Sequence, residues 1–546
     1  MEKRLLFGYS RFSDYLKMNG YRVDKTLMIK EFLDRKEKIT IVTRPGSMSK
    51  SVQLSMLADF FDITKDSHKL FEGTKIMETS YASEMNQHPV VYLSFDYAAY
   101  YMGAVADFIK RAIRNEYERY QYIFENMNEY EQRNYQRNKN GLLNLNDENL
   151  RSISDSIAFL MEMLKKYYHK DVMLFIDEYD LPFRHALLYD FHDKLKWEIS
   201  PLYYDTFVYS QDLKYAFLVG RQHTYNEVFE KIDMPLPYTV EDHAYAEYFG
   251  FTSQDVQEFL EYFGFEFNNE VKKEYGGYKV GNQEIYNPYS IVCYVDNGEF
   301  GYGWAYNASV NKLCNAFLEV MEKDNHLEED FEKLIIEGKV EAVVDFNTFY
   351  YERPCAETLW GFAVNSGYLT IEEVISKEEH KYCLKIPNAE TRREIAKILE
   401  KYLSDDDFLT IIWELVDEDQ KDFLAYYQFF VRKPINQGLL NENSYRAMLL
   451  GMSIYLVDKY EIKSHYSVDR HEIVLKAKNP TQTSFVLEFK YLKGKGKNVQ
   501  EKLEQLAEQA VQQIIDKKYD EGLTGKVVYI GLAHYQKDVA MKWIER

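Results

Sequence analysis

Lys50 and Ser51 follow a short apolar run and a turn rich in Pro, Gly and Ser, within the sequence ITIVTRPGSMSKSVQLSML of residues 39–57. Apolar residues then recur at helical spacing from Val52 onward. Strand, turn, Lys-Ser and helix is the order of a phosphate-binding loop, in which backbone N–H groups at a helix N-terminus hold phosphate. In such a loop Lys50 would reach the β- and γ-phosphates of ATP, and Ser51 would coordinate Mg²⁺.

The residue before this lysine is Ser49, where the generic loop G-x-x-x-x-G-K-[ST] has glycine, and Gly46 is out of register. Glycine permits a positive φ at that position and leaves room for phosphate at the backbone. A serine held in a left-handed conformation costs on the order of 1 kcal/mol. We therefore expect weakened ATP binding, and a loss of turnover is an open alternative. A serine hydroxyl that donates to phosphate would be an imperfect substitute.

Asp177 and Glu178 follow the apolar run VMLFI of residues 172–176. An aspartate at the tip of a buried strand holds Mg²⁺, and the glutamate after it orients the water that attacks the γ-phosphate. This acidic pair is the partner that a phosphate-binding loop requires. The sequence therefore predicts a nucleotide site whose acidic half is intact and whose loop is altered.

Glu488 and Lys490 lie two residues apart in the predicted strand SFVLEFKY of residues 484–491. Residues at i and i+2 of a strand share a face, so both side chains point together, with Phe489 buried behind them. The preceding strand carries a further acidic residue, Glu472, and a helix with glutamine follows. Carboxylates that hold Mg²⁺ beside a lysine that positions the attacking water make up the site of PD-(D/E)xK nucleases.

Six lysines lie within 22 residues around this strand pair, and Glu488 is the one acidic residue among them. Lysines near Gly-Lys turns neutralise backbone phosphates and make nucleic-acid binding salt-sensitive. The candidates for such contacts, besides Lys490, are Lys476, Lys478, Lys493, Lys495 and Lys497. A solvated hairpin explains the same lysines equally well, and no helix that would read base edges is evident.

The elements that must position these residues begin with four apolar runs, at residues 38–43, 89–95, 171–177 and 214–220. Long helical patterns separate them, and this alternation is typical of an α/β fold with a parallel, P-loop NTPase-type sheet. The last run is expected to be an edge strand, and it ends at Arg221 and Gln222, which are candidates for sensing phosphate. The polar residues 116–149 read as an exposed insertion, a solvated helix pair.

Helices dominate the expected structure between residues 250 and 434. TSQDVQEFLEYF (252–263) begins with an N-cap residue and continues with an amphipathic pattern. Further helices are predicted at residues 327–344, 369–378, 390–403 and 405–430. We therefore expect a helical lid and connector over residues 246–434, after a P-loop domain over residues 1–245.

A small α/β domain is predicted over residues 435–546. Its expected helices span residues 443–457 and 499–518, and its expected strands span residues 471–476, 484–491 and 526–532. The charge changes at the same boundary, because residues 435–546 carry 17 Lys and Arg against 14 Asp and Glu, whereas the rest of the chain has a net charge of −24. An acidic surface opposes nonspecific nucleic-acid binding, which leaves the C-terminal region as the part suited to it.

Composition favours a soluble, cytoplasmic protein. The four cysteines, at 293, 314, 355 and 383, show no C-x-x-C spacing, which excludes a zinc ribbon or redox motif and is typical of a reducing compartment. No run of about 18 apolar residues exists, so we predict no membrane span. The apolar stretch at the N-terminus is too short for a signal peptide.

Four blocks of the sequence resemble the bacterial AAA-ATPase-like family, in the family's order. They are YRVDKTLMIKEFL with ITIVTRPGSMSKSVQLSMLADFF, then FIDEYDLP, then YNPYSIVCYVDNGEFGYGW. The usual loop of that family reads R-P-R-R-F-G-K-[ST], of which this sequence keeps Arg44, Pro45, Lys50 and Ser51. The resemblance adds Arg44 to the expected nucleotide-binding residues and covers nearly the whole chain, since members carry a C-terminal PD-(D/E)xK nuclease-like domain.

The resemblance also implies supporting residues in the C-terminal domain. In DRHEIVL the family's first strand places Arg470 on its arginine, Glu472 on the catalytic aspartate and Asp469 on a glycine. The metal-binding aspartate is thus either replaced by Glu472 or supplied by Asp469, and an extra methylene that moves a carboxylate by about 1 Å can cost roughly 10²-fold in rate. Glu442 matches an acidic position on a helix, and Gln513 matches the helical glutamine.

Two readings follow from these motifs. In the first, a P-loop ATPase-like module that binds ATP and Mg²⁺ is coupled to a Mg²⁺-dependent nuclease-like module acting on nucleic acid, most readily DNA, in a protein that can form a homo-oligomer. In the second, both sites are impaired, and the chain is a nucleotide- or nucleic-acid-binding scaffold that acts through a protein partner. The acidic pairs favour the first reading, whereas Ser49 and the glutamate at 472 favour the second.

Overall fold

The computed structural model describes residues 3–546 apart from several short gaps. The gaps are residues 7, 98, 146, 224–226, 302–312, 314, 318, 321–326, 328–329, 332, 335–336, 403–407, 433–441, 457–458, 468–469 and 493–497. The chain forms two compact units, the first made of residues 1–307, 343–382 and 387–390, and the second of residues 308–342, 383–386 and 391–546. The α/β fold that the sequence predicts is confirmed in both.

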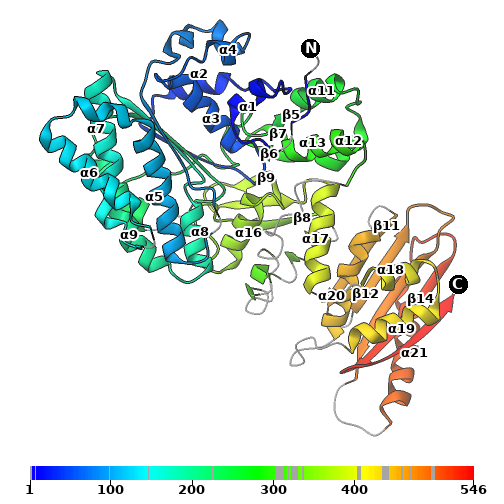
Figure 1. Ribbon diagram of the computed structural model, residues 1–546. Helices are drawn as coiled ribbons and strands as arrows, with labels where there is room; N and C mark the ends of the chain where they lie inside the picture. Colours follow the sequence, from blue (N-terminus) through cyan, green and yellow to red (C-terminus); the bar gives the residue numbers. More distant parts are fainter. Residues whose placement is uncertain are drawn as a thin grey trace. The chain divides into compact units, whose positions relative to one another are not determined.

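A four-stranded parallel sheet forms the centre of the first unit (Figure 1). Its strands are β1 (Ile39–Thr43), β2 (Val90–Ser94), β3 (Val172–Asp177) and β4 (Leu213–Gly220). Their order in the sheet is β1-β4-β3-β2. The prediction of an edge position for residues 214–220 is therefore wrong, because β4 lies between β1 and β3 and pairs with both.

Alternate residues of these strands enter two separate cores, because successive side chains of a strand point to opposite faces. Ile41, Leu174 and Leu218 pack with helices on one face, whereas Val42 and Phe175 pack on the other. Burial on both faces explains the continuous apolar runs in the sequence. The carboxyl ends of β1, β3 and β4 consequently meet at one edge, where the polar residues that follow them come together.

The helices of the first unit precede, connect and follow these strands. They are α1 (Phe12–Lys17), α2 (Leu27–Arg35), α3 (Lys50–Phe61), α4 (His68–Phe71), α5 (Met102–Arg119), α6 (Glu129–Leu143), α7 (Ser156–Tyr168), α8 (Leu181–Leu188), α9 (His192–Tyr204) and α10 (Glu227–Lys231). Residues 116–149 are less exposed than the sequence predicts, because Tyr135, Asn138 and Leu142 of α6 are buried. This helix pair belongs to the core of the unit.

A second, antiparallel sheet of three short strands follows in the same unit, in the order β5-β7-β6. Its elements are β5 (Phe251–Thr252), α11 (Ser253–Tyr262), α12 (Asn269–Tyr275), β6 (Tyr278–Val280), β7 (Gln283–Tyr286) and α13 (Pro288–Asn297). The predicted N-cap of α11 is confirmed, since Thr252 accepts the N–H of Asp255 in a capping box. The predicted helical middle region thus also contains short strands.

The chain continues with β8 (Lys339–Val343), α16 (Ala356–Asn365), β9 (Thr370–Ser376), β10 (Lys381–Lys385) and α17 (Ala389–Tyr402). The predicted helix at 390–403 is confirmed. The predicted helices at 327–344 and 369–378 are wrong where they overlap β8 and β9. In β9, the consecutive exposed glutamates of TIEEVIS obscure the strand period. In β8, exposed and buried residues do alternate, but over only five residues.

A five-stranded sheet, in the order β11-β12-β13-β14-β15, forms the second unit. Its elements are α18 (Phe408–Val416), α19 (Gln420–Val431), α20 (Glu442–Ser453), β11 (Tyr460–Ser467), β12 (Arg470–Ala477), β13 (Ser484–Tyr491), α21 (Val499–Lys517), β14 (Val527–Tyr535) and β15 (Asp538–Glu545). The pair β13–β14 is parallel and the other pairs are antiparallel. Only the edge strands β11 and β15 are missing from the sequence prediction.

Helices cover both faces of this sheet. Side chains of α18, α19 and α20 pack with Ile473 and Leu487 on one face, and those of α21 pack with Val474 and Val486 on the other. No helix among the described residues is long and apolar enough to cross a membrane.

Candidate functional site

Serines hold the left-handed positions of the loop that joins β1 to α3. Ser49, the N-cap residue of α3, has φ 59° and ψ 21°, and Ser47 has φ 61°. Gly46 lies outside the left-handed region, and a Cβ added there would meet Arg221 only at an ordinary contact distance of 3.5 Å. Gly46 therefore occupies a position where the backbone does not require glycine. The predicted left-handed strain is found at Ser49.

Lys50 folds back onto the same loop. Its ammonium group donates to the carbonyl oxygens of Arg44 at 3.1 Å and Pro45 at 2.9 Å, and it lies 3.9 Å from Glu178 Oε1. Burial lowers the pKa of this amine to about 8, against the opposing effect of Glu178. The lysine thus occupies the concave side of the loop, where phosphate would otherwise accept its hydrogen bonds.

Ser51 and Asp177 meet across the ends of α3 and β3, because the Ser51 hydroxyl hydrogen-bonds to the Asp177 carboxylate. Burial, together with the neighbouring Glu178, raises the pKa of Asp177 to about 7. Its Oδ1 atom is buried and accepts no hydrogen bond from any described residue. A hydroxyl beside a buried carboxylate with an unused oxygen fits Mg²⁺, which prefers oxygen ligands.

Three cations surround Glu178. Arg184 Nη2 donates to its Oε2 atom at 3.1 Å, and Arg221 Nε and Lys50 Nζ lie within 4 Å. Burial opposes ionisation of this carboxyl, but Lys50, Arg221 and Arg184 outweigh burial and hold its pKa below the usual range. Glu178 is therefore charged and tightly held, as a residue that orients water must be.

A cavity of about 310 Å³ opens beside this loop, at the lower end of the range for small-molecule sites. Ser47 to Gln53, Asp96, Glu178 and Arg221 form its polar side. The aromatic side comes from residues that the sequence analysis did not assign to the nucleotide site. They are the N-terminal residues Tyr9, Phe12, Tyr15 and Tyr21 with Phe251, Phe259 and Tyr289.

The structure places Arg44 away from this cavity. The guanidinium group is buried and donates to the carbonyl oxygens of Thr43, Tyr238, Thr239 and Ala244 at 2.8–3.2 Å. It therefore ties the start of the loop to a segment almost 200 residues later. This geometry gives Arg44 a positioning role, in contrast to the direct nucleotide contact that the resemblance implies.

Two further residues support the loop from a distance. Asn287, the first residue of the NPYS block, caps α13 and donates from Nδ2 to the Gly46 carbonyl at 3.3 Å. Asp180 accepts the backbone N–H groups of Arg221 and Gln222 and pairs with Arg184. Asn287 and Asp180 belong to blocks that carry the family resemblance. Their supporting role could have been inferred from that resemblance but not from local sequence patterns. Arg221 thus reaches the site as predicted, although from a central strand.

In the second unit, Glu472 of β12 and Glu488 of β13 are directly opposite in the antiparallel register. Both are buried, with exposed fractions of 2% and 0%. Lys490 Nζ lies 3.3 Å from Glu488 Oε1, and Phe489 enters the core on the other face, as the i, i+2 spacing predicts. The sheet register therefore brings the two carboxylates and the lysine to one place.

Gln513 of α21 completes this cluster. Its Nε2 atom donates to Glu488 Oε1 at 2.7 Å, and its Oε1 atom accepts from Lys490 at 2.5 Å. The amide thus fixes the carboxylate and the ammonium group relative to each other. Such a polar group between two charged side chains limits their rotamers and fixes their orientation.

The other supporting residues are placed less fully. Asp469, Lys493, Lys495 and Lys497 lie outside the described residues, and the side chains of Glu442 and Arg470 lie outside them too. Glu442 is the first residue of α20, a helix whose side chains pack on the sheet face opposite α21. Arg446 of the same helix is buried and donates to Ser464, whose hydroxyl donates to the Glu472 carbonyl.

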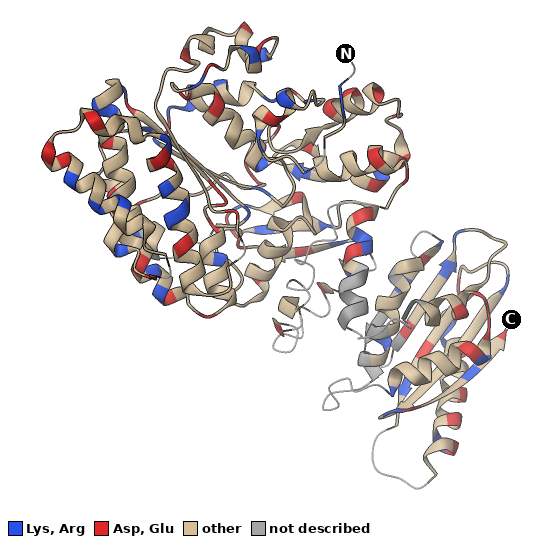
Figure 2. Cartoon of the chain, in the orientation of Figure 1, with Lys and Arg blue, Asp and Glu red and all other residues tan. Residues whose placement is uncertain are grey.

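Lys476 and Lys478 are described, and an acidic side chain partly offsets them. Lys476 is opposite Glu461 in the β11–β12 register. Lys463, and more weakly Lys476 and Lys478, lower the pKa of Glu461. In the first unit, charges of both signs are interspersed along the helices (Figure 2).

Comparison with protein-family models identifies both halves of this arrangement. Residues 7–234 match the family described as predicted AAA-ATPase, and residues 440–543 match the PD-(D/E)XK nuclease superfamily. No curated protein and no solved structure matches the chain.

Each match covers one of the two clusters described above, since Lys50, Asp177 and Glu178 lie in the first matched range and Glu472, Glu488 and Gln513 lie in the second. The chain carries an AAA-ATPase-like domain followed by a domain of the PD-(D/E)XK nuclease superfamily.

Proposed function

We propose that this protein binds Mg²⁺ and ATP in its AAA-ATPase-like domain and cleaves nucleic acid, with DNA as the first substrate to test, in its nuclease-like domain. The observation that carries the proposal is the cluster of Glu472, Glu488, Lys490 and Gln513 on one sheet face. A sheet with a purely structural role has no need of two opposed buried carboxylates, whose charges repel unless a cation lies between them.

At the nuclease site, Glu472 and Glu488 would hold Mg²⁺, which supplies charge stabilisation and an activated water. Lys490 lies where it can donate to a phosphate oxygen or to that water. Gln513 keeps both groups in place through its two hydrogen bonds. Lys476 and Lys478, with the predicted contacts at 493, 495 and 497, would neutralise the phosphates of the flanking strand.

At the nucleotide site, Ser51 and Asp177 would hold Mg²⁺, and Lys50 would leave the carbonyl oxygens of Arg44 and Pro45 to reach phosphate. Glu178 would orient the attacking water, and Arg221 would contact the phosphate end of the nucleotide. The aromatic side of the cavity would take the base. Ser49 would contact phosphate through its backbone N–H or hydroxyl group.

Mg²⁺-dependent cleavage of linear and circular duplex DNA by the full chain tests the nuclease assignment. We expect cleavage with Mg²⁺, none with EDTA, and a loss of at least about 10²-fold in Glu488→Gln and Lys490→Met. Glu504→Gln is the matched control, because Glu504 is exposed on α21 and contacts only Gln500 among the residues whose hydrogen bonds are described. Equal cleavage by Glu488→Gln and the wild type would assign the activity elsewhere.

The second candidate function is a scaffold in which neither site turns over. The strained Ser49 and the lysine that bonds back to its own loop favour it. It predicts that the protein binds nucleotide or DNA without hydrolysis, and that it acts through a protein partner. Nucleotide-dependent stabilisation without any Mg²⁺-dependent cleavage of DNA or RNA would support this function over the first.

A further inference from the structure

A second cavity of about 180 Å³ lies beside the proposed nucleotide site, between α3, β2 and α5. Its lining residues are Arg11, Ser55, Ala58, Asp59, Asp62, Lys65, Val90, Tyr92, Ser94, Ala112, Asn115, Glu116 and Arg119. Among the described residues, none of these also lines the cavity of the nucleotide site. The functions proposed above therefore make no use of this space.

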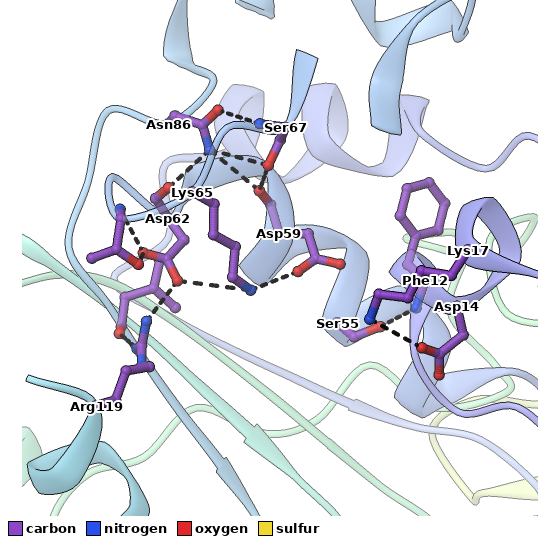
Figure 3. A network of polar contacts seen from close by, with 12 residues as sticks. Phe12, Asp14, Lys17, Ser55, Asp59, Asp62, Lys65, Ser67, Asn86 and Arg119 are labelled. Atoms are coloured by element: carbon purple, nitrogen blue, oxygen red, sulfur yellow. Dashed lines mark hydrogen bonds and ion pairs between the residues drawn. The ribbon is translucent and has the colours of Figure 1, made fainter. Parts of the chain in front are cut away.

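Three buried carboxylates line the cavity, and each has a cationic partner. Figure 3 shows two of them, Asp59 and Asp62, with Lys65 and Arg119. Asp62 accepts from Arg119 Nη1 at 2.6 Å and, through its other oxygen, from the N–H and hydroxyl groups of Thr64. Glu116 accepts from Arg119 Nη2 at 2.5 Å and from the N–H of Tyr92. The guanidinium group of Arg119 is thus shared by Asp62 and Glu116, as buried charges require a partner.

Asp59 differs because one of its two oxygen atoms accepts no hydrogen bond from any described residue. Its Oδ1 atom accepts from Lys65 Nζ at 2.7 Å, but its Oδ2 atom is buried and accepts no hydrogen bond from any described residue. In Figure 3 this second oxygen points away from Lys65, toward the side where Ser55 and Phe12 lie. Only 7% of Asp59 is exposed, so solvent does not easily satisfy the unused acceptor.

An unpaired cation lies on the same cavity. Arg11 is exposed, and no described acidic side chain forms an ion pair with it. The cavity thus offers one unused anionic acceptor and one unused cationic donor. Between them, Ala58, Val90 and Ala112 contribute apolar surface to the lining.

This chemistry favours an organic ligand over a metal ion. Among the described residues, the one group of three carboxylates placed to share a metal is Glu414, Asp419 and Asp422, far away in sequence. The Lys65 amine already lies between Asp59 and Asp62, at 2.7 and 3.8 Å, which shows that an ammonium group suits these acceptors. The volume is below the usual range for drug-sized ligands.

We propose that this cavity binds a small zwitterion of the amino-acid type. Its ammonium group would donate to Asp59 Oδ2, its carboxylate would accept from Arg11, and a short aliphatic chain would lie against the three apolar residues. The three acidic and three basic side chains of the lining balance each other, which matches a ligand without net charge.

Tyr92 connects the cavity with the proposed nucleotide site, because it contacts both. Its side chain lines the cavity, and its hydroxyl hydrogen-bonds to Asp177. Asp59 and Ser55 also belong to α3, the helix that begins at Lys50. Occupancy of the cavity would therefore change Mg²⁺-ATP affinity, and this part of the proposal rests on the proposed nucleotide site.

Saturation-transfer NMR and calorimetry on the full chain test the binding itself. The probes are ω-amino acids from glycine to 5-aminopentanoate. Butylamine and butanoate serve as control probes, because each carries only one of the two charges. We expect at least one ω-amino acid to bind more tightly than either single-charge probe. Asp59→Asn and Arg11→Gln should each weaken it by at least about tenfold, since each removes a charged hydrogen bond.

Asp66→Asn is the matched control, because Asp66 is a neighbouring aspartate whose side chain is 87% exposed. It should bind like the wild type. Arg11→Gln changes an exposed residue, so it keeps the test valid if Asp59→Asn fails to fold. Absence of binding at about 10 mM probe, or equal binding by wild type and Arg11→Gln, would overturn the proposal.

The link to the nucleotide site is tested separately. The bound ω-amino acid should shift the Mg²⁺-ATP affinity of the wild type, and Tyr92→Phe should keep the ligand but lose the shift. Ligand binding with an unchanged ATP affinity would refute the link and leave the cavity assigned. If neither the wild type nor Tyr92→Phe binds ATP, the result would instead refute the proposed nucleotide site.

Discussion

Ser49 shows at the scale of one residue how a loop can keep its shape without its glycine. Its backbone is left-handed, at φ 59°, which is the conformation that glycine adopts without cost. The hydroxyl group offers a donor that glycine lacks. Backbone strain therefore lowers the expected affinity for Mg²⁺-ATP, whereas a hydroxyl contact to phosphate would raise it. Substitution separates the two contributions.

We expect Ser49→Gly to bind Mg²⁺-ATP more tightly and to unfold with up to about 1 kcal/mol more free energy, because the left-handed strain is removed. Ser49→Ala keeps the Cβ and loses the hydroxyl group, so it should bind more weakly than the wild type if the hydroxyl donates to phosphate. Calorimetric titration and urea unfolding measure both quantities. Tighter Mg²⁺-ATP binding by the wild type than by Ser49→Gly would show that the hydroxyl contact outweighs the backbone strain.

The two shifted groups of the nucleotide site predict a pH optimum. Burial raises the pKa of Asp177 to about 7, so protonation below that pH removes the Mg²⁺ ligand. Burial lowers the pKa of Lys50 to about 8, so deprotonation above that pH removes the phosphate donor. Mg²⁺-ATP affinity should therefore be highest between about pH 7 and 8.

Titrations between pH 5.5 and 9.5 test this expectation, at intervals chosen to resolve changes near the two pKa values. Lys50→Arg should lose the alkaline decline, because arginine keeps its charge throughout the range. The same affinity at pH 6, 7.5 and 9 in the wild type would contradict the assignment of both residues to the nucleotide.

At the scale of elements, the contact between α21 and β14 positions the nuclease cluster. Gly531 of β14 is opposite Glu488 in the parallel register. A Cβ at Gly531 would approach the Ala507 carbonyl of α21 to 2.1 Å, so any larger residue must push the helix away. Gln513 lies on the same helix and depends on this close approach.

Gly531→Ala should therefore destabilise the nuclease-like domain by about 1–3 kcal/mol and reduce Mg²⁺-dependent cleavage, because Gln513 loses its position. Val528→Ala is the matched control on the same strand. Its side chain enters the core on the opposite face, so it should lower stability without moving α21. Cleavage that follows stability alone in both variants would argue against this role of the helix.

The elements also show what the sequence can predict. Strands β1, β2, β3, β4 and β13 are apolar over most of their length, so local pattern suffices for them. The order β1-β4-β3-β2 and the cage around Arg44 depend on residues far apart in the chain, which no local pattern reports. The face shared by Glu488 and Lys490 follows from strand periodicity, whereas the cavity around Asp59 depends on the packing of α3 against α5 and β2.

At the scale of the whole molecule, charge distinguishes the C-terminal residues 435–546 from the rest of the chain. Residues 435–546 have a net charge of +3 within a chain of −21, so nucleic acid should bind through lysines of the C-terminal domain. The slope of log affinity against log salt changes by about 1 for each phosphate group that the protein neutralises. Lys476→Gln should make this slope shallower by about 1 in DNA-binding titrations. Lys542→Gln should leave it unchanged, since Lys542 pairs with Glu508.

The division into two compact units predicts two unfolding transitions in calorimetry of the full chain. Each unit has its own hydrophobic clusters, so each can unfold cooperatively. Mg²⁺-ATP at about 100 times its Kd should stabilise the first unit by about 2.7 kcal/mol, which raises one transition by several degrees. Lys50→Ala should lose this increase, and Gly531→Ala should lower only the other transition. A single transition would contradict independent unfolding of the two units. A nucleotide that raised both of two transitions would show that its effect also reaches the second unit.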